Sequence, residues 1–132
     1  WRARLGEFDW IILALPSTPE TRHGIGADEL AGMKSNAVLV NFARGDVIDQ
    51  PAMIEALSAK SIEAALLDVA EPEPLPADHP LWSLDNAQIT SHLSGRAQTK
   101  MFQRSADRFI ANLVRWDAGE PVAPQMDLAL GY

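Results

Sequence analysis

Four short apolar runs divide the first two thirds of the chain. They are Trp10–Leu15, Ala37–Phe42, Glu63–Leu67 and Ala87–Thr90. Each has the length of a strand, and the first two are nearly continuous apolar runs, a pattern typical of strands buried on both faces of a parallel sheet. We therefore predict four strands and expect both faces of the first two to be buried.

Helix signals occupy the segments between these runs. Asp49 is a typical N-cap residue, Pro51 suits the first helical turn, and the apolar residues that follow share one helix face. This pattern predicts a helix from Asp49 to about Ala59. Shorter helical segments are expected at Asp28–Met33 and in the turn after Thr18.

A longer helix is expected in the last third of the chain. Apolar residues recur there at steps of three and four positions: Phe102, Ala106, Phe109, Ile110, Leu113 and Trp116. Gly119 stands where a helix C-cap belongs, and Pro121 follows it. The pattern predicts a helix over Arg96–Asp117 whose aromatic residues belong to a core rather than to a base-stacking surface.

Strands separated by helices or long crossovers indicate a parallel α/β sheet. We therefore predict an α/β fold: a partial Rossmann-like, doubly wound sheet with flanking helices and a long C-terminal helix. The connection Asp68–Asn86 contains four prolines and suits neither a helix nor a central strand. A connection of this length in a compact domain is usually functional.

Composition narrows the classes of function. The balance of 47% apolar and 22% charged residues among 132 is that of a globular domain. A net charge of -7 without a basic cluster argues against a nucleic-acid partner.

No apolar run approaches the roughly 18 residues of a membrane span, so no membrane association is expected. The chain has no cysteine, which rules out thiolate metal sites and makes the cytoplasm the expected location. No metal site is expected.

Ionisable residues follow three of the predicted strands. Ligands of open parallel sheets bind beyond the carboxyl ends of the strands. Arg44 follows the second strand, Asp68 the third and His92 the fourth, while Glu71 and Glu73 lie in the proline-rich connection. These residue types at one edge of a sheet suit a ligand site, although solvated loop charges are an equal alternative from the residue types alone.

The order of these residues resembles a known family. The segments Asn41–Gly45, Leu67–Pro74 and Thr90–His92 are similar to motifs of the D-isomer-specific 2-hydroxyacid dehydrogenases, and Leu15–Thr21 and His79–Trp82 fit as well. The family catalyses reversible hydride transfer between NAD(P)H and a 2-oxo acid. The resemblance thus implies NAD or NADP as cofactor, without distinguishing them, a small 2-oxo or 2-hydroxy acid as substrate, and a homodimer.

The resemblance also implies roles for individual residues. Arg44 would clamp the substrate carboxylate with its planar fork of donors. His92 would give a proton to the carbonyl oxygen, and Glu73 would hold the other ring nitrogen and favour the charged imidazole. Asp68 resembles the carboxylate that binds the nicotinamide carboxamide. Besides Arg44, Asp68 and His92, cofactor contacts are implied for Pro16, Thr21, Phe42, Ala43, Ser94 and Gly95.

Several residues admit other interpretations. Glu71 competes with Glu73 for the acid role, but the five-residue spacing from Asp68 favours Glu73 and leaves Glu71 as a solvated loop charge. His79 is expected to be a local structural residue, and Arg44 alone would suit a surface ion pair. Two positions depart from the family pattern. Ala70 stands where the family often has an aromatic residue, and Ser91 where it usually has proline.

The glycine-rich turn that receives the pyrophosphate in this family has no counterpart here. Gly24-Ile25-Gly26 is the nearest match, but Glu29 stands at the third glycine position and no strand precedes it. We therefore expect a fragment, with residues 1–95 as the C-terminal half of an NAD(P)-binding domain and 96–132 as a helix and tail. Alone, it should be inactive and self-associate. A non-catalytic, dinucleotide-sensing binding protein of the same fold is the alternative.

Overall fold

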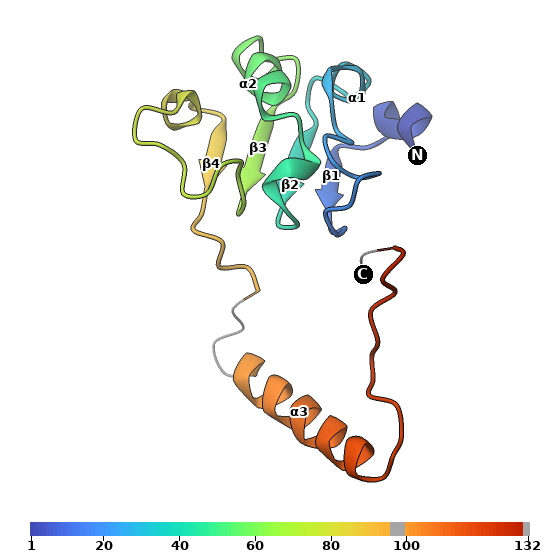
Figure 1. Cartoon of the computed structure of the whole chain (residues 1–132). Coiled ribbons are helices and arrows are strands. Elements are labelled where there is room, and N and C mark those ends of the chain that lie inside the picture. Colours follow the sequence, from blue (N-terminus) through green and yellow to red (C-terminus); the bar gives the residue numbers. More distant parts are fainter. Residues whose placement is uncertain (96–99, 131–132) are drawn as a thin grey trace. The chain divides into compact units, whose positions relative to one another are not determined.

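A computed structural model of the chain describes residues 1–95 and 100–130. The chain divides into two compact units, Trp1–His92 and Leu93–Tyr132, and each is described by itself (Figure 1). The first unit ends at the histidine of the third motif, and the division into domains at residues 95 and 96 stays a prediction. Positions 96–99, which open the predicted C-terminal helix, and the last two positions lie outside the described residues.

The first unit contains a parallel sheet of four strands in the order β1-β2-β3-β4 (Figure 1). The strands are β1 (Trp10–Leu13), β2 (Val38–Asn41), β3 (Ala64–Leu67) and β4 (Ala87–Ile89). The α/β class and all four strands are thus confirmed, with bounds shorter than predicted by one or two residues. Leu13, Asn41, Leu67 and Ile89 are partners in the register, so the strands end at one common edge.

Short helices connect the strands. They are η1 (Arg2–Glu7), α1 (Ala27–Ala31), η2 (Gly45–Val47), α2 (Gln50–Ser58) and η3 (Pro80–Ser83). The predicted cap of α2 is confirmed, because the Asp49 side chain accepts a hydrogen bond of 3.2 Å from the Ala52 N–H. The chain after Thr18 forms a hydrogen-bonded turn rather than a helix.

The core of the first unit lies against one face of the sheet. Leu39 of β2 is fully buried there, together with Met53 and Leu57 of α2. The prediction that β1 is buried on both faces is wrong, since Trp10 is 59% and Ile12 57% exposed. Ile11 and Leu13 point to the opposite face of the sheet and are buried. Among the described residues, α1 and α2 pack against each other and cover that face only.

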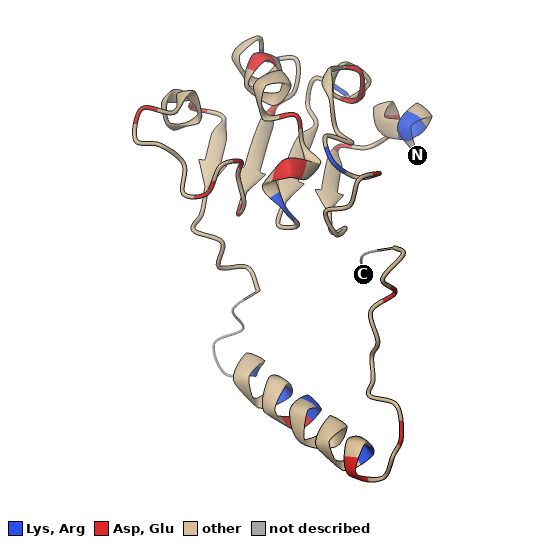
Figure 2. Cartoon of the chain, in the orientation of Figure 1, with Lys and Arg blue, Asp and Glu red and all other residues tan. Residues whose placement is uncertain are grey.

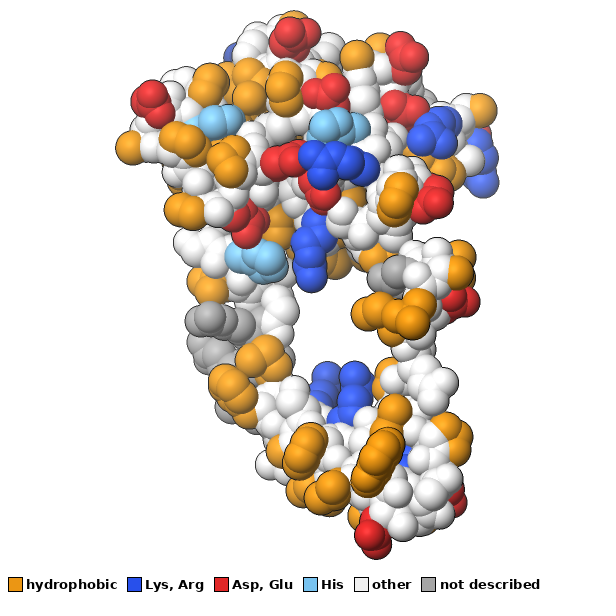
Figure 3. Space-filling model, viewed as in Figure 1, with side chains coloured by type: hydrophobic (Ala, Val, Ile, Leu, Met, Phe, Trp, Pro, Cys, Tyr) orange, Lys and Arg blue, Asp and Glu red, His pale blue; other side chains and the backbone are white. Residues whose placement is uncertain are grey.

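The second unit contains one long helix, α3 (Met101–Asp117). It ends as predicted at Asp117, and Gly119 follows two residues later. Gly119 has a φ of 71°, which lets the Glu120 N–H reach the Arg115 carbonyl oxygen at 2.8 Å. The predicted core role of the aromatic residues is wrong for this unit. Phe102, Phe109 and Trp116 are 69–79% exposed, and Figure 3 shows hydrophobic side chains along the helix surface.

The reason for this exposure is local. An amphipathic helix buries its apolar stripe only against a second element. The remaining described residues of this unit form turns and extended chain, so α3 has no such element beside it there. Among residues 1–95 and 100–130, no helix combines the length and the apolar character needed to cross a bilayer.

Candidate active site

Charged loops leave the common edge of the sheet (Figure 2). Arg44 comes three residues after the end of β2, Asp68 directly follows β3 and His92 follows β4 by three residues. Because the strand ends are in register, the three loops start side by side. The structure therefore places a cation, a carboxylate and an imidazole at the edge where the sequence pattern predicted them.

Glu73 and His92 form a hydrogen-bonded pair. The distance from Glu73 Oε2 to His92 Nδ1 is 2.9 Å, and Glu73 Oε1 accepts from the Ala70 N–H at 2.8 Å. Burial acts to raise the pKa of Glu73, and Asp68 acts in the same direction. The hydrogen bonds from His92 and Ala70 outweigh both, so the pKa lies below its ordinary range. An ionised Glu73 only accepts, hence His92 Nδ1 donates and Nε2 is the nitrogen left to exchange a proton with a ligand.

The backbone of His92 is in a conformation unusual for this residue. Its φ is 55°, in the left-handed region that costs a non-glycine residue about 1–2 kcal/mol. Two contacts with the exit of β3 hold it there: the His92 N–H donates to the Asp68 carbonyl oxygen at 2.9 Å, and Thr90 Oγ1 donates to Asp68 Oδ1. Strain of this kind gathers at functional sites, where the surroundings fix the side chain in one orientation.

Arg44, Glu73 and His92 line one open cavity of about 360 Å³. Asp68 lines an adjoining cavity of about 440 Å³ together with Glu73 and His92, which therefore face both spaces. Arg44 is exposed, and its Nη1 donates to the Ala43 carbonyl oxygen at 2.7 Å. Its remaining donors can bind a planar carboxylate.

Asn41 fixes the turn that carries Arg44, a role that we did not predict. This residue is 1% exposed. Its Nδ2 donates to the Arg44 carbonyl oxygen at 2.9 Å, and its Oδ1 accepts from the Ala43 N–H at 3.0 Å. An amide at the last position of an apolar strand was the signal in the sequence, because a buried amide needs partners close by.

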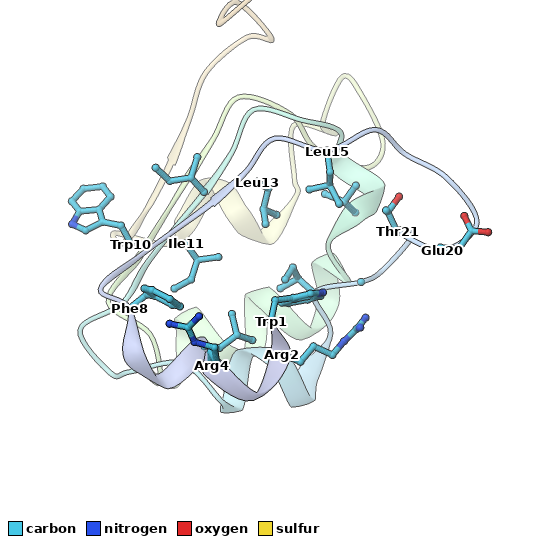
Figure 4. Close-up of a pocket in the computed structure, with 15 residues that line it drawn as sticks. Trp1, Arg2, Arg4, Phe8, Trp10, Ile11, Leu13, Leu15, Glu20 and Thr21 are labelled. Carbon is cyan, nitrogen blue, oxygen red and sulfur yellow. The ribbon is translucent and has the colours of Figure 1, made fainter. Parts of the chain in front are cut away.

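Cofactor contacts are also implied for six further residues. Thr21 Oγ1 donates to the Pro16 carbonyl oxygen at 2.7 Å, and the Thr21 side chain lines an apolar groove of about 540 Å³ beside β1 (Figure 4). Phe42 is 42% exposed and Ala43 is buried. Ser94 and Gly95 are exposed residues of the second unit. For these six residues a cofactor contact stays a prediction.

Two loop residues differ in how they match expectation. Glu71, predicted to be a solvated loop charge, is 36% exposed, but it also binds Arg22 at 2.7 Å and His23 at 3.2 Å, which we did not predict. Sequence spacing misses this because the partners lie 49 and 48 positions apart. His79 is the predicted structural residue: its Nδ1 accepts from the Leu81 N–H at 3.3 Å and begins η3.

The backbones of the Arg44 turn and the proline-rich loop are in close contact at Gly45 and Ala70. A Cβ atom added to Gly45 would lie 2.0 Å from the Ala70 carbonyl oxygen. We expect Gly45→Ala to lower the free energy of unfolding by about 1–3 kcal/mol, because two backbone segments must separate. Urea denaturation measures this. Gly95→Ala is the matched control, since its Cβ meets nothing within 4 Å, and equal stability of the two variants would contradict the contact.

The family model of the D-isomer specific 2-hydroxyacid dehydrogenases, NAD binding domain, matches residues 2–94. The chain belongs to this family. The resemblance carried by the three motifs is thereby confirmed. The family's glycine-rich turn has no substitute in α1, because the Gly26 N–H at its start already binds Glu29 Oε2 at 3.0 Å.

Relatives support the same membership. D-3-phosphoglycerate dehydrogenase of Methanocaldococcus jannaschii is 47% identical over 107 residues, which cover 81% of this chain and 20% of the relative. Glyoxylate/hydroxypyruvate reductase B of Yersinia pestis is 43% identical over 102 residues, covering 77% and 31%. The structure of a D-isomer specific 2-hydroxyacid dehydrogenase from Xanthobacter autotrophicus Py2 with NADPH and MES superposes with a TM-score of 0.90 at 40% identity, covering 99% and 53%. The chain thus spans between a fifth and about half of these relatives.

Proposed function

We propose that the chain forms part of the active site of an NAD(P)-dependent dehydrogenase that interconverts a small 2-oxo acid and its D-2-hydroxy acid. The observation that carries the proposal is the Glu73–His92 hydrogen bond of 2.9 Å in a cavity that Arg44 also lines. A carboxylate-bound imidazole beside a guanidinium suits a substrate that has a carboxylate next to a carbonyl group.

Each of the three side chains has one task in this reaction. Arg44 binds the substrate carboxylate and orients the adjacent carbonyl group. His92 Nε2 gives a proton to the carbonyl oxygen during reduction and takes it back during oxidation. Glu73 holds Nδ1 and stabilises the imidazolium, since its lowered pKa keeps it ionised. The nicotinamide, when bound, supplies or accepts the hydride.

Asp68 fits the nicotinamide end of the cofactor. It is 9% exposed, lies at the carboxyl end of β3 and lines the cavity that adjoins the Arg44 cavity. A carboxylate oxygen there can accept from a carboxamide NH2 group. Both the NAD-binding family and the NADPH-bound relative fit this assignment, so we leave the choice between NAD and NADP open.

The relatives narrow the substrate class. Glyoxylate and hydroxypyruvate, named for the Yersinia reductase, are small 2-oxo acids that an Arg44 clamp suits. We propose them as first substrates to assay. A homodimer and a cytoplasmic location fit an enzyme of this class and stay predictions.

Glu73→Gln tests the acid–base pair. Because Glu73 has a lowered pKa, it is charged throughout the neutral range and favours the protonated imidazole. Without that charge, the fall of kcat/KM for reduction with rising pH should move to lower pH. A pH profile of glyoxylate reduction by the whole enzyme measures the shift. Glu63→Gln, at an exposed position, is the matched control, and an unmoved profile in Glu73→Gln would contradict the pair.

A further inference from the structure

We propose that Glu71 is a positioning residue, which holds the Arg44 turn and the Glu73 loop in a fixed relation. This inference rests on the function proposed above and concerns a carboxylate that takes no part in proton transfer. Glu71 lines the same cavity as Arg44 and His92, but it is Glu73 that contacts His92. The two Glu71 carboxylate oxygens are bound by Arg22 and His23, so we infer that Glu71 acts through the loops that it joins.

The Glu71 carboxylate is one end of a bridge to the Arg44 turn. Arg22 Nη2 donates to Glu71 Oε1 at 2.7 Å, and its Nη1 donates to Asp46 Oδ2 at 3.3 Å. Asp46 lies two residues after Arg44, and Ser17 Oγ donates to the same Oδ2 at 2.6 Å. One guanidinium thus ties the proline-rich loop to the turn that carries the proposed substrate clamp.

The other Glu71 oxygen and the loop around Arg22 complete this bridge. His23 Nε2 lies 3.2 Å from Glu71 Oε2, and the His23 N–H donates to the Asp46 carbonyl oxygen at 2.7 Å. Arg22 and His23 therefore each contact both Glu71 and Asp46. Two parallel links restrict sliding of one loop along the other more than a single ion pair would.

The backbone of Glu71 is clamped by Gln50 at the start of α2. Gln50 Nε2 donates to the Glu71 carbonyl oxygen at 2.6 Å, and the Glu71 N–H donates to Gln50 Oε1 at 3.0 Å. Gln50 is 6% exposed, so its amide has a fixed orientation. Glu73, the partner of His92, follows two residues later in the same loop. By fixing the Glu71 backbone, Gln50 therefore also fixes the position of Glu73.

Close packing transmits any movement of one loop to the other. The Gly45 and Ala70 backbones leave no room even for a methyl group. Loss of the Glu71 bridge should let the Arg44 turn shift and weaken its hold on the substrate carboxylate. The Gln50 contacts with the Glu71 backbone do not depend on the Glu71 side chain, so Glu73 should keep its place beside His92. We expect the main effect on substrate binding. Asp46, to which the bridge is anchored, lies only two residues from Arg44, the proposed substrate clamp.

Kinetics of the whole enzyme test the inference. Glu71→Ala should raise KM for glyoxylate about 10-fold and leave kcat within about threefold. Glu71→Gln keeps an acceptor for Arg22 and should restore most of the loss. Glu7→Ala, which breaks the surface pair between Arg4 and Glu7 at 2.9 Å, is the matched control and should behave as wild type.

A double-mutant cycle identifies the route. If Glu71 acts through Arg22, Arg22→Ala combined with Glu71→Ala should cost no more than the larger single change. Arg22→Lys, a milder change, should also raise KM, since a point charge cannot bridge two carboxylates. If the effects of Arg22→Ala and Glu71→Ala on KM add up in the double variant, the positioning role is overturned. Wild-type KM in both Glu71→Ala and Arg22→Lys would also overturn it, and either result would leave the proposed function standing. An inactive wild-type enzyme would instead overturn the proposed function, and this inference with it.

Discussion

Replacement of His92 by alanine is expected to lower kcat of the whole enzyme by about 10²–10⁴-fold, the range that general acid catalysis contributes. The alanine enzyme lacks any group at the position of Nε2 to protonate the carbonyl oxygen. The measurement is the steady-state rate of glyoxylate reduction at saturating substrate and cofactor. KM for glyoxylate should change much less, because Arg44 remains.

Folding must be checked for this variant, since His92 sits in the left-handed region with a φ of 55°. Alanine at this position keeps the backbone N–H that binds the Asp68 carbonyl oxygen. Urea denaturation of the variant should therefore stay close to that of the wild type. A fully folded His92→Ala enzyme with wild-type kcat would remove His92 from the mechanism.

Arg44→Lys is expected to lower kcat/KM for 2-oxo acids by about 10²-fold. A guanidinium makes two parallel hydrogen bonds to a carboxylate, and an ammonium is a point charge that cannot reproduce that geometry. Hydrogen bonds to charged groups contribute about 1.5–3 kcal/mol each, and 2.8 kcal/mol corresponds to about 10²-fold. Both KM and kcat should suffer, because the clamp also orients the carbonyl group.

Arg4→Lys is the matched control for this change. Arg4 makes a surface pair with Glu7 at 2.9 Å, and the same substitution there should leave kcat/KM unchanged. Equal kcat/KM in Arg44→Lys and the wild type would contradict the role of Arg44 as the substrate clamp.

Local signals in the sequence were sufficient for the strands and the longest helix of the first unit. The apolar runs identify all four strands, and the Asp49 cap places the start of α2. Burial was harder to predict. A run such as Trp10–Leu13 has the same composition whether one face or both are covered, and only the packing of the described elements shows that Trp10 and Ile12 are exposed. The same limit applies to the stripe of α3.

The candidate site shows the same division. Arg44, Asp68 and His92 come together as the order of the strands predicts, because parallel strands end at a common edge. The five-residue spacing from Asp68 correctly favoured Glu73 as the partner of His92. Glu71 and Gln50 escaped prediction, since their contacts join loops that have no periodic pattern and lie 21 or more positions apart.

The most direct test of the central claim is a turnover assay of the whole enzyme with reduced nicotinamide cofactor and glyoxylate or hydroxypyruvate, run beside His92→Ala. We expect oxidation of the cofactor in step with formation of the 2-hydroxy acid, with D configuration when hydroxypyruvate is the substrate, and a loss of about 10²–10⁴-fold in the variant. Tight binding of the cofactor without turnover, equal in both proteins, would contradict the account and identify a dinucleotide-binding protein instead.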